Sequence, residues 1–153
     1  MNHKNRRNEN TIFLSPIFCQ FLLVSQVAAQ RPSDLFTILF QSTDYGRKMR
    51  VPALQLLLRG QPTDKPDLAK LASPVSHLDK QDPPLMLIHG DADPQMPQQQ
   101  AREFAQAYES QKLPVQFIIL AGGKHGGAAF YDTERTTFIG TFLKPHLQPK
   151  SSH

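Results

Sequence analysis

The 153-residue chain has one cysteine and no tryptophan, and charged residues make up only 20% of it. A single cysteine, Cys19, excludes an internal disulfide framework and any zinc site built from cysteines. The 13 prolines and 8 glycines indicate many turns, while 39% hydrophobic residues are typical of a globular chain. The length suits one domain and is sufficient to bury a core.

The formal net charge of +4 does not come from a basic stripe. Lysines and arginines are scattered among acids, and residues 31–153 carry 14 basic against 12 acidic residues. A nucleic-acid-binding surface requires clustered cations, often interleaved with aromatic side chains. We therefore expect no nucleic-acid partner.

The first 30 residues follow the order of a secretory signal peptide. Polar and basic residues 1–10 precede a mostly apolar stretch at 11–24, and small residues ending at Ala29 follow. Pro16, Cys19 and Gln20 interrupt the apolar stretch, so it does not predict a stable membrane span. Two interpretations stay open. Residues 1–29 are either an export signal of a periplasmic or secreted protein, or an apolar strand, helix or non-homologous leader of a cytoplasmic one.

Residues 31–72 predict connecting helices and no strand. The expected helices run from Ser33 or Asp34 to about Thr43, from Val51 to Leu58 and from Pro66 to Ala72. Ser-Pro at 73–74 ends the last of them.

Two apolar strands alternate with two helices in the rest of the chain. The strands are expected at Leu85–His89 and Val115–Leu120, and the helices at Gln98–Lys112 and Phe130–Leu143. A strand, a helix and a second strand in this order predict a right-handed parallel crossover. The fold class is therefore α/β, with a parallel sheet flanked by helices.

Four titratable side chains follow the two strands, at the sheet edge where ligands of parallel sheets gather. They are His89, Asp91, Asp93 and His125. Asp93 and His125 suit an acid and base pair, in which a buried carboxylate orients an imidazole. Alternatively, Asp93 caps the helix that starts after Pro97, and His125 is a loop histidine bonded to the backbone.

A metal site is another use of these four side chains. The Asp-x-Asp turn, however, lacks the glycine and the terminal glutamate of a calcium loop, and the chain has no His-x-x-x-His helix. We therefore expect no metal.

Two motifs resemble the C-terminal part of the α/β-hydrolase fold, near its esterase/lipase branch (feruloyl-esterase-like or prolyl-oligopeptidase-like). Residues 89–97, His-Gly-Asp-Ala-Asp-Pro-Gln-Met-Pro, are similar to the family pattern His-Gly-x-x-Asp-x-x-Val-Pro, with Met96 in place of valine. Residues 122–126, Gly-Gly-Lys-His-Gly, are similar to Gly-x-x-His-Gly. The Ala-Ser-Pro segment at 72–74 also resembles this branch. The resemblance covers residues 31–148, leaving a leader at 1–30 and a polar tail at 149–153.

The resemblance implies hydrolysis of small carboxylic esters by a serine hydrolase without a cofactor. It places Asp93 at the triad acid and His125 at the triad base. It implies a structural role for His89, packed beneath the acid turn, and a turn-stabilising role for Asp91.

The family's Gly-x-Ser-x-Gly nucleophile motif is absent from the 153 residues. The resemblance places this motif and the family's oxyanion loop in the N-terminal half of the sheet, and residues 1–30 resemble neither. We therefore expect a C-terminal fragment that is inactive alone and exposes unpaired sheet edges through which it self-associates. The alternatives are a non-catalytic remnant or binding protein with this fold, and a peptidase of the same superfamily.

Overall fold

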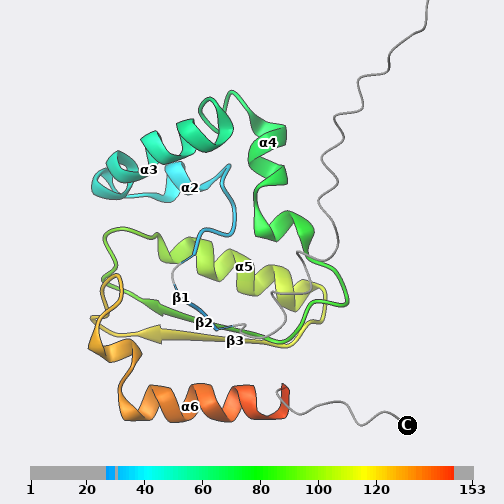
Figure 1. Cartoon of the computed structure of the whole chain (residues 1–153), viewed down its shortest axis with the longest axis vertical. Helices are drawn as coiled ribbons and strands as arrows, with labels where there is room; N and C mark the ends of the chain where they lie inside the picture. Colours follow the sequence, from blue (N-terminus) through cyan, green and yellow to red (C-terminus); the bar gives the residue numbers. More distant parts are fainter. Residues whose placement is uncertain (1–26, 30, 147–153) are drawn as a thin grey trace, which may run out of the picture.

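The computed structural model describes residues 27–29 and 31–146. Its three-stranded parallel sheet has the order β1-β2-β3, formed by β1 (Val27–Ala29), β2 (Leu85–Gly90) and β3 (Val115–Leu120). Helix α5 (Gln98–Ser110) joins β2 to β3 across one face of the sheet, and α6 (Thr133–Leu143) covers the other face (Figure 1). The predicted α/β class, with an incomplete parallel sheet flanked by helices, is confirmed.

Strand β2 is buried along its whole length, as its continuous apolar run predicts. Successive side chains of a strand point to opposite faces. Leu85 and Leu87 accordingly pack with Ala105 and Tyr108 of α5. On the other face, Met86 and Ile88 pack with Leu120 and Phe130, against which Ile139 and Phe142 of α6 also lie.

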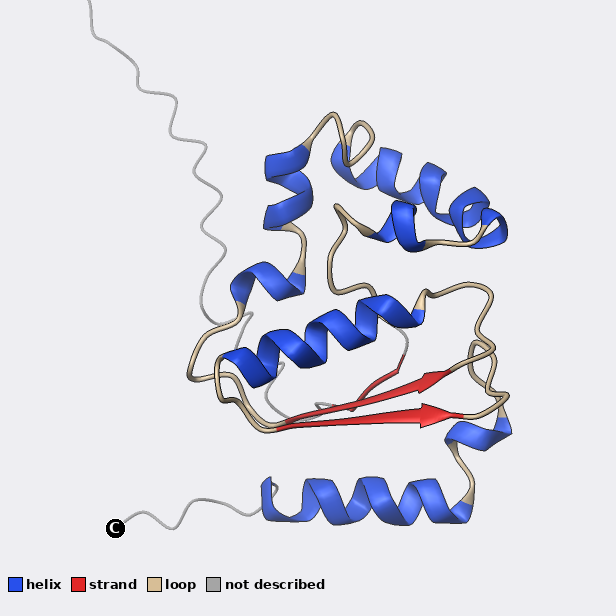
Figure 2. Ribbon diagram, turned by 180° about the vertical axis from the view of Figure 1, so that it is seen from behind, coloured by secondary structure: helices blue, strands red, loops and turns tan. Residues whose placement is uncertain are grey.

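A helical layer lies beyond α5, on its side away from the sheet (Figure 2). It consists of α2 (Ile38–Gln41), α3 (Asp44–Leu58), α4 (Pro66–Leu71) and the 3-10 turn η1 (Pro74–His77). Its core cluster contains Leu35, Ile38, Leu54, Leu58 and Ala69, together with Met96 from the turn after β2. The turn that carries Asp93 is therefore anchored in this layer as well as in the sheet.

The buried side chain of Gln100 ties the helical layer to α5. Its Oε1 accepts hydrogen bonds from the backbone N–H groups of Ser33 (2.9 Å) and Asp34 (2.8 Å). Its Nε2 donates to Thr37 Oγ1 (3.1 Å) and Gln41 Oε1 (2.6 Å). Gln100 is fully buried, so these bonds satisfy polar groups that have no access to water.

The prediction of a helix from Ser33 or Asp34 to Thr43 is wrong, because only Ile38–Gln41 is helical there. The Ser33 and Asp34 backbone N–H groups bond to Gln100, a partner 66 to 67 residues away, instead of to a local helix start. The Asp34 carboxylate still accepts a local hydrogen bond from Phe36 N–H (2.8 Å), but a turn follows it and the helix begins only at Ile38.

The predicted start of the second helix at Val51 is also wrong, because α3 begins at Asp44. Thr43 is its N-cap, and its side chain accepts a hydrogen bond from the N–H of Gly46 (3.1 Å). Pro52 therefore lies inside the helix, where it removes one N–H donor from the ladder. The 15-residue helix tolerates this loss where Pro52 is exposed to solvent.

The last helix is shorter than predicted. Residues Ala128–Phe130 form the 3-10 turn η2, and α6 starts at Thr133 with the Asp132 carboxylate accepting a hydrogen bond from Arg135 N–H (2.7 Å). The 3-10 turn η3 (Lys144–His146) follows α6. Phe138 in this helix is 43% exposed.

The predicted signal peptide and the tail at 149–153 fall on residues that are, except for Val27–Ala29, outside the described part. Val27–Ala29 form β1, which pairs with Met86–Ile88 of β2, in keeping with the strand alternative for this stretch. Within the described ranges, no helix is both long and apolar enough to cross a membrane.

Candidate functional site

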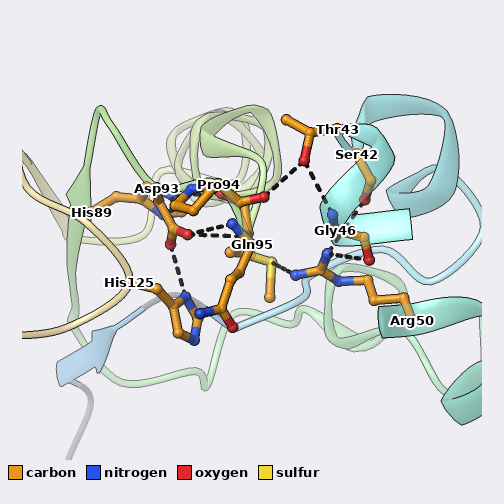
Figure 3. Close-up of polar contacts among 10 residues, drawn as sticks. Ser42, Thr43, Gly46, Arg50, His89, Asp93, Pro94, Gln95 and His125 are labelled. Carbon is orange, nitrogen blue, oxygen red and sulfur yellow. Dashed lines mark hydrogen bonds and ion pairs between the residues drawn. The ribbon is translucent and has the colours of Figure 1, made fainter. Parts of the chain in front are cut away.

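Asp93 and His125 meet beyond the carboxyl ends of β2 and β3. The ring nitrogen Nδ1 of His125 lies 2.8 Å from Asp93 Oδ2 (Figure 3). The Asp93 side chain is 1% exposed, whereas that of His125 is 35% exposed. The predicted approach of the two side chains on adjacent parallel strands is therefore confirmed, while their chemical roles stay a prediction.

The other carboxylate oxygen of Asp93 is held by its own turn. Asp93 Oδ1 accepts hydrogen bonds from the N–H groups of Gln95 (2.7 Å) and Met96 (3.0 Å). The alternative role as the cap of α5 does not fit, because the N-cap residue of that helix is Pro97 and no side chain caps it. The carboxylate is thus fixed by two backbone donors on one oxygen and faces the imidazole with the other.

The two turns are joined to each other by their backbones. Asp91 N–H donates to Leu120 O (3.1 Å), and Ala92 N–H donates to Gly123 O (3.0 Å). The Asp91 carboxylate accepts a hydrogen bond from Gly122 N–H at 2.7 Å. Asp91 thus stabilises the turns, as predicted, and joins the turn that carries Asp93 to the turn that carries His125.

His89 packs beneath the acid turn, as predicted. Its ring is 1% exposed and its Nε2 donates to Met96 O at 3.1 Å. Its Nδ1 has no hydrogen-bond partner among the described residues. Burial lowers the pKa of His89, against the opposing effects of the Met96 carbonyl and the nearby Asp93 carboxylate. The surroundings of His89 therefore favour its neutral form. Its Nε2 lies 3.8 Å from Asp93 Oδ2.

The contact with Asp93 selects one tautomer of His125. A carboxylate only accepts hydrogen bonds, so Nδ1 of His125 carries the proton and Nε2 keeps its lone pair. Nε2 has no hydrogen bond to another residue of the described part. A histidine oriented in this way can accept a proton at Nε2, and its charged form is stabilised by the carboxylate behind it.

None of the titratable side chains in the described ranges form a group of three or more that could hold a metal ion. Asp91 points to Gly122 N–H and Asp93 points to His125. These two carboxylates are thus engaged separately, and the four side chains weighed above do not converge on one point.

Sequence reasoning missed the contribution of α3. Thr43 Oγ1 donates to Pro94 O at 2.7 Å, and Arg50 Nη2 contacts Met96 Sδ at 3.6 Å. The only local signal was Thr43-Asp44 followed by Gly46, which is an N-cap pattern and says nothing of a contact 51 residues away.

The chain matches the model of the BD-FAE family over residues 18–108, a stretch that includes Asp93 and ends before His125. Esterase LipQ of Mycobacterium tuberculosis (strain ATCC 25618 / H37Rv) is 38% identical to it over 61 residues. These residues make up 39% of this chain and 14% of LipQ.

Solved structures of esterases are similar over most of this chain. A truncated form of a carbohydrate esterase from gut microbiota has a TM-score of 0.65 and 28% identity, covering 78% of this chain and 41% of that one. A bifunctional GH43-CE protein of Bacteroides eggerthii has a TM-score of 0.66 and 29% identity, covering 80% and 16%.

An acylaminoacyl peptidase of Pyrococcus horikoshii shares the fold, with a TM-score of 0.58 at 20% identity over 77% of this chain and 18% of that one. The chain thus spans less than half the length of each of these proteins. The resemblance to the esterase branch of the α/β-hydrolases is confirmed.

Proposed function

The chain belongs to the BD-FAE family of esterase-like α/β-hydrolases, and on this premise we propose that Asp93 and His125 are the acid and base of a serine ester hydrolase. The single observation that carries the proposal is the 2.8 Å contact between Asp93 Oδ2 and His125 Nδ1. The substrates of this proposed hydrolase are carboxylic esters, and no cofactor takes part in the proposed reaction.

The geometry supports a defined role for each side chain. His125 Nε2 takes the proton of a serine hydroxyl during attack on the ester carbonyl, and returns it to the leaving alcohol. Asp93 holds the ring in the required tautomer and stabilises the imidazolium. Because Gln95 and Met96 N–H groups fix Asp93 Oδ1, the carboxylate needs no rearrangement as the charge develops.

The proposal includes a nucleophile that this chain does not supply. No Gly-x-Ser-x-Gly occurs in its sequence, and the buried hydroxyls of Ser33, Ser42 and Ser73 are hydrogen bonded to Gln100, Ile38 and Ala69 respectively. An acid and a base without a nucleophile have no hydroxyl to activate. We propose that ester hydrolysis requires a serine and an oxyanion hole from outside residues 1–153.

The first test uses the chain by itself. Purified residues 1–153 should not hydrolyse p-nitrophenyl acetate, p-nitrophenyl butyrate or an acetylated sugar above the buffer rate. Hydrolysis that disappears in His125→Ala would contradict the missing-nucleophile part of the proposal, because the chain would then hold a complete site.

The second test examines the acid and base roles. Residues 31–146 replace the matching part of a catalytically complete BD-FAE member, which supplies the serine. The chimera should hydrolyse esters, and Asp93→Asn should lower kcat by about 10⁴-fold, as loss of the triad acid does in serine proteases.

His146→Ala is the control for this chimera, because His146 lies in η3, at the end of α6 away from the tips of the strands (Figure 1). It should keep the parent rate. An active chimera that is indifferent to Asp93→Asn and His125→Ala would refute the proposed roles.

A further inference from the structure

Residues 94–96, in the turn that follows Asp93, contact the N-cap residue of α3 and two residues on the same face of that helix. Thr43, Gly46 and Arg50 are spaced so that they share a face of the helix start. The residues opposite them are Pro94, Gln95 and Met96 (Figure 3). None of these three α3 residues belongs to the family motifs that contain Asp93 and His125.

The first two contacts involve backbone atoms of the turn. Thr43 Oγ1 donates to Pro94 O at 2.7 Å and also accepts the N–H of Gly46. A Cβ atom on Gly46 would lie 2.8 Å from Gln95 O, 2.8 Å from Arg50 Nη1 and 3.4 Å from Pro94 O. The end of the Arg50 side chain can move aside, but the Gln95 carbonyl is backbone, so α3 approaches the turn this closely only because residue 46 has no side chain.

The third contact is made by a half-buried arginine. Arg50 Nη1 donates to Gly46 O at 3.2 Å, and Nη2 contacts Met96 Sδ at 3.6 Å. Met96 is 6% exposed and packs in the core cluster with Leu54 and Leu58 of the same helix. Burial lowers the pKa of Arg50, and the negative charge of Asp93 opposes this shift.

Residues 94–96, which α3 contacts, also orient the Asp93 carboxylate, since Gln95 and Met96 provide both N–H groups that bind Asp93 Oδ1. We propose that the face of α3 formed by Thr43, Gly46 and Arg50 positions Asp93: it fixes residues 94–96, and these hold the carboxylate toward His125. The structural part of this inference concerns only the Asp93–His125 contact. Its catalytic consequence rests on the proposed function.

Gly46→Ala in the full chain tests whether the contact of α3 with residues 94–96 positions Asp93. The added methyl would displace the turn backbone at Gln95, whereas the methyl of the control Gly140→Ala in α6 meets nothing within 4 Å. The readout is the His125 tautomer, measured by NMR from the ring ¹⁵N shifts and from the Nδ1 proton signal. Gly46→Ala should weaken that proton signal and increase the Nε2–H population, and Gly140→Ala should keep the wild-type spectrum.

A second pair of variants covers the case in which Gly46→Ala does not fold. Thr43→Val removes the hydroxyl that binds Pro94 O, while Thr43→Ser retains it. The Nδ1 proton signal should weaken in Thr43→Val and return to the wild-type level in Thr43→Ser. Wild-type spectra in folded Thr43→Val, or equal losses in both variants, would overturn the inference.

The chimera separates this inference from the proposed function. If both hold, Gly46→Ala lowers kcat by up to about 10²-fold, the scale of a small misplacement of a catalytic group, with little change in KM. If the NMR result holds but Asp93→Asn leaves kcat unchanged, α3 still positions the carboxylate and the catalytic assignment alone fails.

Discussion

The backbones of Gly90 and Gly123 are in contact where the turn that carries Asp93 and the turn that carries His125 leave the sheet. A Cβ atom on Gly123 would lie 3.0 Å from Gly90 Cα, and one on Gly90 would overlap the carbonyl group of Gly123. This contact leaves room for the hydrogen bond between Ala92 N–H and Gly123 O that joins the two turns.

Gly90→Ala should therefore lower the free energy of unfolding by about 3 kcal/mol or more, as expected for an added methyl that meets rigid backbone. Urea unfolding followed by circular dichroism would measure the loss. Gly140→Ala, whose methyl is unobstructed, should equal or exceed the wild type, because alanine is favoured over glycine in a helix. An unchanged midpoint for Gly90→Ala would show that the turns can separate freely.

Gln100→Leu should lower the free energy of unfolding by about 2–4 kcal/mol, since it leaves the buried N–H of Ser33 and the partly buried N–H of Asp34 without their acceptor. The neighbouring Gln99→Leu is the matched control, because Gln99 is exposed and its side chain donates to Glu103 on the same helix in a solvent-exposed bond that water can replace. Chemical denaturation of both variants gives the comparison. Equal effects of the two substitutions would argue against Gln100 as the link between α5 and the helical layer.

His89 should make the fold less stable in acid. Its pKa is lowered in the folded state, so between that value and about 6.5 the unfolded chain binds more protons. The stability due to neutral His89 is therefore complete above about pH 6.5 and is lost as the pH falls through the folded-state pKa. Urea unfolding from pH 8 to pH 5 should show a steeper loss in the wild type than in His89→Gln. Parallel profiles for the two proteins would contradict this assignment.

The chain should self-associate as its concentration rises. In the described part, β1 and β3 each have β2 as their sheet partner and no other, so the outer edges of both strands are unpaired. Ile119 on β3 is 40% exposed, and Ile119→Lys should reduce association because edge charges block strand pairing. Sedimentation velocity over a concentration series would measure it, with Gln99→Lys on α5 as the control. A concentration-independent monomer would contradict the prediction.

The sequence predicted strands β2 and β3 and the approach of Asp93 to His125 because local patterns determine these features, whereas a strand was only one of the alternatives for the residues that form β1. Continuous apolar residues define β2 and β3, and the polar turns after two parallel strands must lie at the same edge. The helical layer was predicted poorly because its bounds depend on distant partners. Ser33 bonds to Gln100, and Thr43 bonds to Pro94, across 67 and 51 residues.

The contacts of α3 with residues 94–96 could not be predicted from the sequence for the same reason. Gly46 within a helix is a weak local signal, and its meaning depends on the carbonyl of Gln95 that lies against it. Arg50 likewise acquires its environment only when Met96 enters the core of the helical layer.

The helix that joins β2 to β3 brings Asp93 and His125 together across a short stretch of chain. Asp93 and His125 are 32 residues apart, whereas the contact of Ser33 with Gln100 closes a loop of 67 residues. The difference in closure entropy is modest, roughly 0.6 kcal/mol per doubling of loop length, but it favours the shorter loop. The strand pair and its two turns are therefore expected to form first in folding. The helical layer is expected to dock afterwards, and its contacts with residues 94–96 then fix the Asp93 carboxylate toward His125.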